Sequence, residues 1–156
     1  MPSSSATDLW DTLAVEAAAE SELWGDALRP LPEREGVFGQ LAPERFALGL
    51  ETIYEGYLVH YGRSRLFAPT DDESALLLGD YLYAHGLVRI AAIGEVEAVV
   101  VLAELISTCA HLRAERATGD GEAWVEAVRR LGGDPGYDDV EQALAAHASR
   151  LVSSPP

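Results

Sequence analysis

The sequence predicts an all-α protein that folds as a single bundle of helices. No stretch of strand length alternates apolar and polar residues, and Gly and Pro separate segments that are long enough for helices. With 156 residues, 48% of them hydrophobic, the chain is long enough to bury one core. We therefore expect one helical domain over residues 8–152, between disordered Ser/Pro-rich tails at 1–7 and 153–156.

The first two helices are expected over about Asp8 to Leu28 and Pro43 to Tyr61. Apolar residues at helical spacing form a stripe along the first segment. Pro43 suits the first turn of the second helix, because its missing N–H would have no partner there. The stretch between them contains three Pro or Gly breaks and is expected to be a loop.

Four further helices are expected in the rest of the chain. The third follows the capping acids 71–73 and ends near Gly94, and the fourth covers 95–118. A shorter helix follows 119–120, and the last covers 138–152. The third and fourth are apolar nearly all round, so each needs cover from the core and from something else, which we interpret as another subunit.

The charge of the chain excludes several classes of partner. There are 26 acidic residues and 11 basic ones, all arginine, which gives a net charge of -15. This balance argues against nucleic acid and anionic membrane surfaces as partners, and it favours a basic patch on a protein partner.

The sequence also indicates a cytoplasmic protein without an integral membrane segment. Cys109 is the only cysteine, so no internal disulfide is possible and a reducing compartment is expected. The first residues resemble no secretory signal, and the longest apolar stretch, 75–112, is interrupted by charges. Cys109 itself is expected to be a buried spectator in an apolar helix face.

Three segments carry a more specific resemblance. They are Gly25 to Pro30 (GDALRP), Leu50 to His60 (LETIYEGYLVH) and Leu76 to Ala84 (LLLGDYLYA). In this order they resemble the G-K-R-L-R-P segment, the E-x-x-H-x-x-x-L-V-H helix and the L-x-G-D-Y-L-x-A helix of trans-prenyl diphosphate synthases. The resemblance implies a truncated isoprenoid synthase fold.

The chain departs from this family at the substrate sites. The family's helix leads into a D-D-x-x-D motif that binds magnesium, but its three aspartate positions are here Tyr61, Gly62 and Arg65. The second such motif is also missing, because the segment 138–142 lacks its final acid. By this comparison the chain has no catalytic residue, no metal site and no cofactor of its own, and magnesium would enter only through a catalytic partner.

The family's second diphosphate site has lost most of its cations as well. Asp26 and Ala27 stand where the family has a lysine and an arginine, and only Arg29 persists. We interpret Arg29 and Arg65 as the remains of a diphosphate site.

The family's assembly surface is expected to be kept. In the family, the G-D-Y-L helix and the helix after it form much of the dimer interface, which predicts interface positions at Leu78, Tyr81, Leu82, His85, Val88, Val100, Leu102, Leu105 and Ile106. The chain is similar in size and losses to the small subunits of heterodimeric long-chain prenyl synthases. The leading hypothesis is therefore a non-catalytic accessory subunit that docks on a catalytic prenyl diphosphate synthase subunit and influences product chain length.

Two other functions are kept open. One is a stand-alone homodimer that binds an isoprenoid-like apolar molecule, and the other, with the least support, is an enzyme with its own chemistry. The tyrosines of the matched helices could line an isoprenoid tail, but packing is favoured.

Several polar residues have simpler interpretations. Glu51 and Glu55 share a helix face and are interpreted as solvated rather than as metal ligands. His60 is expected to be structural, and Asp80 is expected to bond a neighbouring helix end or a partner. His85, His111 and His147 lack ligand spacing.

Overall fold

The computed structural model describes residues 5–151, and it confirms the all-α class. Within this range the chain forms seven α-helices and two 3-10 helices: α1 (Ser5–Glu20), α2 (Glu22–Asp26), η1 (Gly39–Leu41), η2 (Glu44–Phe46), α3 (Ala47–Tyr61), α4 (Asp72–Ile93), α5 (Val96–Ala114), α6 (Asp120–Arg130) and α7 (Tyr137–Leu151). One isolated antiparallel bridge joins Leu28 and Phe67. Of the expected tails, residues 1–4 and 153–156 lie outside the described residues, whereas residues 5–7 belong to α1 rather than to a disordered tail.

The first expected helix is two helices in the structure. The chain breaks at Ser21, which has an extended backbone and whose side chain accepts a hydrogen bond from the Leu23 N–H at 3.1 Å. Such a hydrogen bond from the backbone to a serine side chain competes with the continuous helix, and Ser21 then acts as the N-cap of α2. The helix expected from Pro43 starts later, because Pro43 has a ψ of 141°, which is not helical, and a 3-10 turn precedes α3.

The limits of α4 agree with the sequence prediction. Asp71 is the N-cap, and its Oδ1 accepts a hydrogen bond from the Ser74 N–H at 2.7 Å. The helix ends at Gly94, whose φ of 92° lies in the left-handed region that glycine adopts without steric cost.

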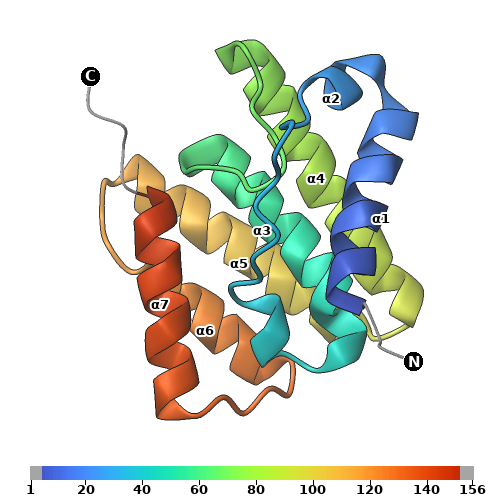
Figure 1. The fold of residues 1–156 in the computed structure, drawn as a ribbon. Helices are drawn as coiled ribbons and strands as arrows, with labels where there is room; N and C mark the ends of the chain where they lie inside the picture. Colours follow the sequence, from blue (N-terminus) through green and yellow to red (C-terminus); the bar gives the residue numbers. More distant parts are fainter. Residues whose placement is uncertain (1–4, 152–156) are drawn as a thin grey trace.

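Helix α3 occupies the centre of the molecule (Figure 1). Helices α1 and α2 lie on one side of it, α5, α6 and α7 on the other, and α4 runs beside it. Ten consecutive residues of α3, Gly49 to Leu58, are buried, so the central helix is covered all round. In contrast, α4 and α5, which were expected to be apolar all round and doubly covered, each bury only one face within the chain.

Glycines let α3 and α4 approach each other closely. Gly49 and Gly56 on α3 lie seven residues apart, as do Gly79 and Gly86 on α4. A Cβ atom at Gly56 would lie 3.0 Å from the carbonyl oxygen of Gly79, and one at Gly86 would lie 3.1 Å from that of Gly49. The two antiparallel helices therefore pack backbone to backbone at two levels, and the 22-residue α4 is held firmly along the core.

The bundle has two hydrophobic cores. The larger one joins α3 to α5, α6 and α7 around residues such as Tyr54, Leu102 and Trp124. The smaller one lies under α1 and α2, where Trp10 and Trp24 pack against the 66–67 segment and α4. Helix α4 contributes to both.

Helix α4 is the one helix among the described residues that is long and apolar enough to cross a membrane by length and composition. In the structure, 28% of its most apolar window is buried, and its glycine face packs on α3. Core helices of soluble proteins pass the same test, so this is weak evidence for a membrane span.

Candidate functional site

The most strongly charged group in the interior is formed by Arg65, Glu51 and Glu55. The Arg65 guanidinium is 2.6 Å from a Glu51 oxygen and 2.7 Å from a Glu55 oxygen, and its side chain has no exposed surface. It also lies over the rings of Trp10 and Tyr54, with its central carbon 4.5 and 5.0 Å from their centroids. Burial disfavours its charge, but the two carboxylates outweigh this effect and raise the pKa of Arg65.

Every oxygen of the two carboxylates has a partner. The second Glu51 oxygen accepts hydrogen bonds from the N–H groups of Val37, at 3.1 Å, and Gly39, at 2.9 Å. The second Glu55 oxygen accepts from the Ser64 hydroxyl at 2.5 Å and from the Leu66 N–H at 3.2 Å. The cluster therefore fixes the loops before and after α3 onto this helix, and we interpret it as structural.

These contacts correct two interpretations of the sequence. The face with Glu51 and Glu55 is not solvated, because the two residues are 2% and 0% exposed. Arg65 is not part of a diphosphate site, since both carboxylates occupy its guanidinium inside the core. The sequence does not show this burial, because two acids at i, i+4 have the same spacing on a solvent-exposed helix face and on a buried one. The arginine that compensates their charge lies ten residues beyond Glu55.

The other predicted diphosphate residue, Arg29, lies on a cavity of about 420 Å³. Tyr61 and Gly62, which occupy two of the family's aspartate positions, line the same cavity together with Arg63. The described residues that line this cavity include no carboxylate, the hard oxygen ligand that magnesium prefers. More generally, no group of three or more potential metal ligands occurs in the part of the chain that the structure describes.

Most of the predicted interface residues do not face outward. Leu78, Leu82, Leu102 and Leu105 are buried in the protein's own cores, at 0 to 4% exposure, and are not accessible to a partner. Two more contact α1 or α2: Tyr81 stacks on Trp24, and His85 pairs with Glu16 at 2.7 Å. The sequence pattern identified apolar helices correctly, but it did not separate their inner faces from their outer ones.

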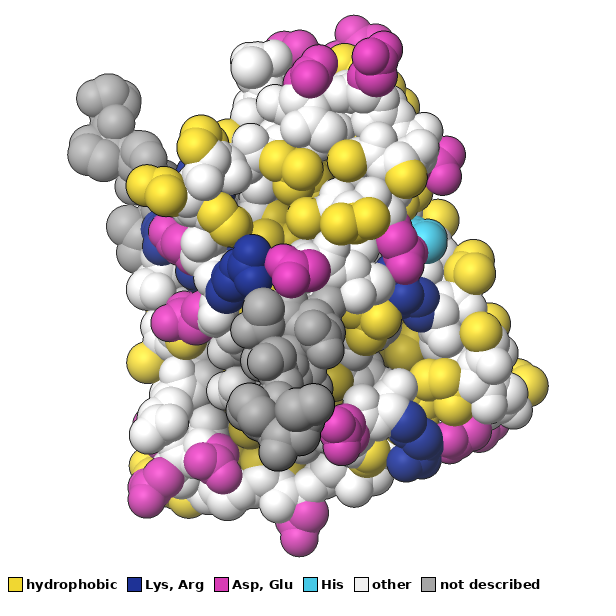
Figure 2. All heavy atoms as spheres, turned by 45° about the vertical axis from the view of Figure 1, so that its right-hand side comes forward, with side chains coloured by type: hydrophobic (Ala, Val, Ile, Leu, Met, Phe, Trp, Pro, Cys, Tyr) yellow, Lys and Arg dark blue, Asp and Glu magenta, His cyan; other side chains and the backbone are white. Residues whose placement is uncertain are grey.

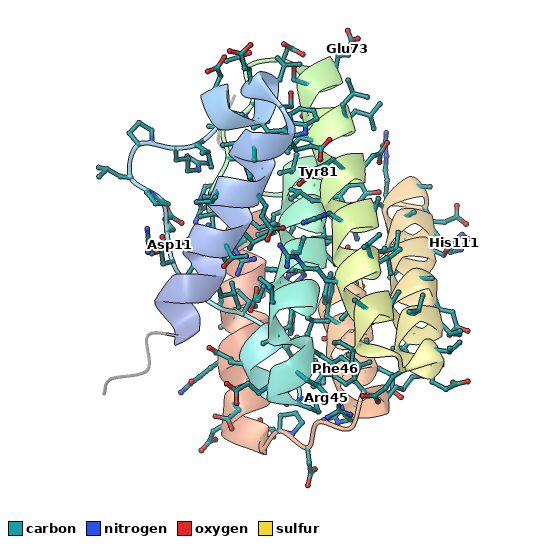
Figure 3. The ribbon with its side chains drawn as sticks, turned by 90° about the vertical axis from the view of Figure 1, so that its right-hand side faces the viewer. Asp11, Arg45, Phe46, Glu73, Tyr81 and His111 are labelled. Carbon is teal, nitrogen blue, oxygen red and sulfur yellow. The ribbon has the colours of Figure 1, made fainter. Side chains whose placement is uncertain are left out.

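Three predicted interface positions remain accessible, and they form part of a larger surface. Val88 is 63% exposed, Val100 is 40% exposed and Ile106 is half-buried. Together with the exposed Ala84, Ala91, Val96 and Ala103, they define what we call the outer face of α4 and α5. Figure 3 shows α4 and α5 side by side at one edge of the molecule, with His111 of α5 projecting away from it.

Charge is distributed unevenly over the surface. Figure 2 shows acidic side chains gathered at the upper and lower ends of one face, with hydrophobic side chains in patches between them. The few basic side chains on this face lie next to acidic ones. Ion pairs of this kind in the structure include Arg34 with Asp11 at 2.9 Å and Arg45 with Glu95 at 2.5 Å.

Two of the three tyrosines of α3 are packed, as the sequence favours, whereas Tyr61 is 37% exposed and lines the cavity beside Arg29. Tyr54 and Tyr57 are fully buried, and their hydroxyls bond His147, at 2.7 Å, and Asp120. Burial raises the pKa of both tyrosines and lowers that of His147, so all three are neutral near pH 7.

The remaining polar residues are explained by local pairs. His60 lies 3.2 Å from Asp80, so Asp80 pairs with a side chain of α3 rather than with a helix end. Burial raises the pKa of Cys109 to about 12, which keeps this buried residue a thiol and a poor nucleophile.

A second cavity, of about 660 Å³, lies beside α1. Its lining includes the apolar side chains of Leu9, Trp10 and Leu48, with Arg34 and Glu44 among its polar residues. No motif in the sequence indicates this cavity, because it is formed where the loop before α3 meets α1.

Comparisons of the chain with known protein families, curated proteins and solved structures found no match. No family model matches the chain. No curated protein and no solved structure matches it either. The resemblance to prenyl diphosphate synthases therefore rests on the three sequence segments.

Proposed function

We propose that this protein is a non-catalytic, cytoplasmic accessory subunit of a two-component prenyl diphosphate synthase. It docks the outer face of α4 and α5 on a catalytic subunit and influences the chain length of its product. Magnesium enters the complex with the catalytic subunit, because the described residues that line the cavity beside Arg29 include no carboxylate to bind it.

The observation that carries this proposal is the exposed apolar surface on the two helices that the resemblance places at a dimer interface. Val88 and Val96 are 63% and 75% exposed, although each belongs to an apolar helix whose opposite face is in the core. Grouped apolar side chains on a surface are typical of protein–protein contacts. The exposed acid beside them, Glu97, favours a partner with basic residues around an apolar centre, whereas Glu104 is already paired with Arg130 at 2.7 Å.

The test is the native mass of the protein in solution, alone and mixed with a full-length prenyl diphosphate synthase from the same source. We expect a one-to-one complex and a change in the length of the synthase's products. A mixture that shows no complex and no change in product length contradicts the proposal.

A matched pair of variants locates the contact. Val88→Asp places a charge in the outer face, and we expect it to weaken the complex at least about tenfold. Val15→Asp is the control, because Val15 is equally exposed at 65% but lies on α1. Equal weakening by both variants would argue against docking through α4 and α5.

A second candidate function is a homodimer that binds an isoprenoid-like apolar molecule. The observation that favours it is the 660 Å³ cavity beside α1, whose volume is in the range of small-molecule sites. Prenyl alcohols would then raise the melting temperature of the protein alone, and Leu48→Gln would reduce that shift. A tight homodimer that ignores the synthase and gains stability from prenyl alcohols would select this function over the first.

A further inference from the structure

Two exposed leucines lie on the pair of helices that an aromatic contact joins. The ring of Trp24 on α2 stacks on that of Tyr81 on α4, with centroids 6.1 Å apart, and this contact holds α2 beside α4. Leu23 precedes Trp24 and is 56% exposed, and Leu77 lies one helical turn before Tyr81 and is 50% exposed. We call Leu23, Leu77 and the half-buried Tyr81 the α2–α4 patch.

Carboxylates without a cation surround this end of the molecule. Residues 5–28 contain no arginine, lysine or histidine. Figure 2 shows acidic side chains gathered at the upper end, where Figure 1 places α2 and the start of α4. Five exposed acids of α1, α2 and α4 are in no ion pair among the described residues: Glu20, Glu22, Asp26, Asp72 and Glu73. Their uncompensated charge attracts a cationic partner.

This negative charge reaches the patch itself. Burial is the main cause that raises the pKa of Tyr81, and the charges of Glu20 and Glu16 raise it further. Glu16 is already paired with His85 and Arg89, whereas Glu20 is exposed. A cationic side chain that reaches the patch therefore meets the uncompensated charge of Glu20.

The secondary structure favours a helical partner. Within residues 5–151 the only β-type contact is the isolated bridge between Leu28 and Phe67, so the described residues offer no strand edge to which an extended segment could add. A segment that docks here must satisfy its own backbone N–H and C=O groups, as a helix does. A helix with an apolar side and basic flanks matches an apolar patch that lies among acids.

We propose that the α2–α4 patch docks a basic amphipathic helix of a partner protein. The apolar side of this helix lies on Leu23, Leu77 and Tyr81, and its basic residues lie toward Glu20 and Glu73. This interaction goes beyond the proposed function and does not depend on it. The patch ends at Tyr81, whereas the outer face of α4 and α5 begins at Ala84.

Fluorescence anisotropy of a labelled peptide, titrated with the full chain, tests this docking. The probe is the acetylated and amidated peptide LKKLLKLLKKLLKL, whose helix has leucines on one side and lysines on the other. A second peptide carries glutamate at every lysine position. We expect saturable binding of the lysine peptide that weakens at high salt, and no binding of the glutamate peptide.

Leu77→Gln removes apolar surface from the patch and keeps an exposed polar residue on α4. We expect an affinity at least about tenfold lower, with an unchanged melting temperature. Glu20→Gln removes one carboxylate charge, and we expect it to lower the affinity about two- to fivefold.

Val96→Gln and Glu97→Gln are the matched controls. Val96 is 75% exposed and Glu97 is exposed, but both lie in the first turn of α5, which follows the other end of α4. Both controls are expected to bind the lysine peptide as the wild type does. The proposal is overturned if the lysine peptide does not bind, if the glutamate peptide binds as tightly, or if Leu77→Gln binds as the wild type does. It is also overturned if Val96→Gln loses as much affinity as Leu77→Gln, since the helix would then lie on the outer face.

Discussion

Replacing Arg65 by methionine tests the interpretation of the buried charge cluster. Methionine keeps most of the side-chain volume but leaves Glu51 and Glu55, which are 2% and 0% exposed, without their cation. Breaking a buried ion pair by removing one partner costs about 3–5 kcal/mol. Small domains have free energies of unfolding of about 5–15 kcal/mol, so this loss is a large share of the stability of the fold.

The assay is urea unfolding followed by the fluorescence of the three tryptophans. With a denaturant dependence near 2 kcal/mol per molar urea, the expected loss lowers the midpoint by about 2 M. Arg130→Met is the control, because it removes an arginine that pairs with Glu104 on the surface, and we expect little change. Equal midpoints for Arg65→Met and Arg130→Met would refute the interpretation.

A double variant separates lost packing from lost charge compensation. Glu55→Gln removes one of the two carboxylate charges and nearly preserves the shape of the side chain. If Arg65 acts by compensating charge, adding Glu55→Gln to Arg65→Met costs less than the sum of the two single changes, because fewer unpaired charges stay buried. Strict additivity would show that Arg65 contributes through packing alone.

Three further predictions concern the core. Gly56→Ala is expected to lower the free energy of unfolding by about 1–3 kcal/mol, because its Cβ would lie 3.0 Å from the Gly79 carbonyl oxygen. Gly136→Ala is the control: its Cβ would meet no atom within 4 Å, so we expect the urea midpoint to stay unchanged or rise. Burial lowers the pKa of His147 below its usual 6.5, so stability is lost as the pH falls below about 6.5, and this slope is smaller in His147→Phe. Burial raises the pKa of Cys109 to about 12, so a thiol reagent at pH 8 reacts slowly with native protein and quickly in denaturant; fast labelling of native protein would contradict its burial.

The sequence predicted the helices well because their signals are local. The N-cap at Asp71 and the glycine at the end of α4 are read from neighbouring residues, and both agree with the structure. The break at Ser21 was missed because the apolar pattern continues across it, and a single capping serine is a weaker signal than Pro or Gly.

The environment of the polar residues was harder to predict because it depends on distant parts of the chain. Glu51 and Glu55 are stabilised by Arg65 and by the loop before α3, and nothing within one helical turn of them shows this. One signal was present: Gly49 and Gly56 on α3 have the same seven-residue spacing as the glycines of α4, which indicates a close helix pair. A helix that packs so closely on a neighbour has little solvent-exposed surface on which two carboxylates could lie.

The division of the interior into two cores has a consequence for local unfolding. Helices α1 and α2 contact the rest of the bundle through the smaller core and through the contacts of Glu16 with His85 and Arg89, while α3 is enclosed by the larger core. An opening confined to α1 and α2 therefore leaves the larger core intact, and the backbone amides of these two helices exchange with solvent at a lower free energy than those of α3. The same opening uncovers Leu78 and Leu82, so transient detachment of the N-terminal helices extends the apolar surface of α4 by two side chains that the closed protein conceals.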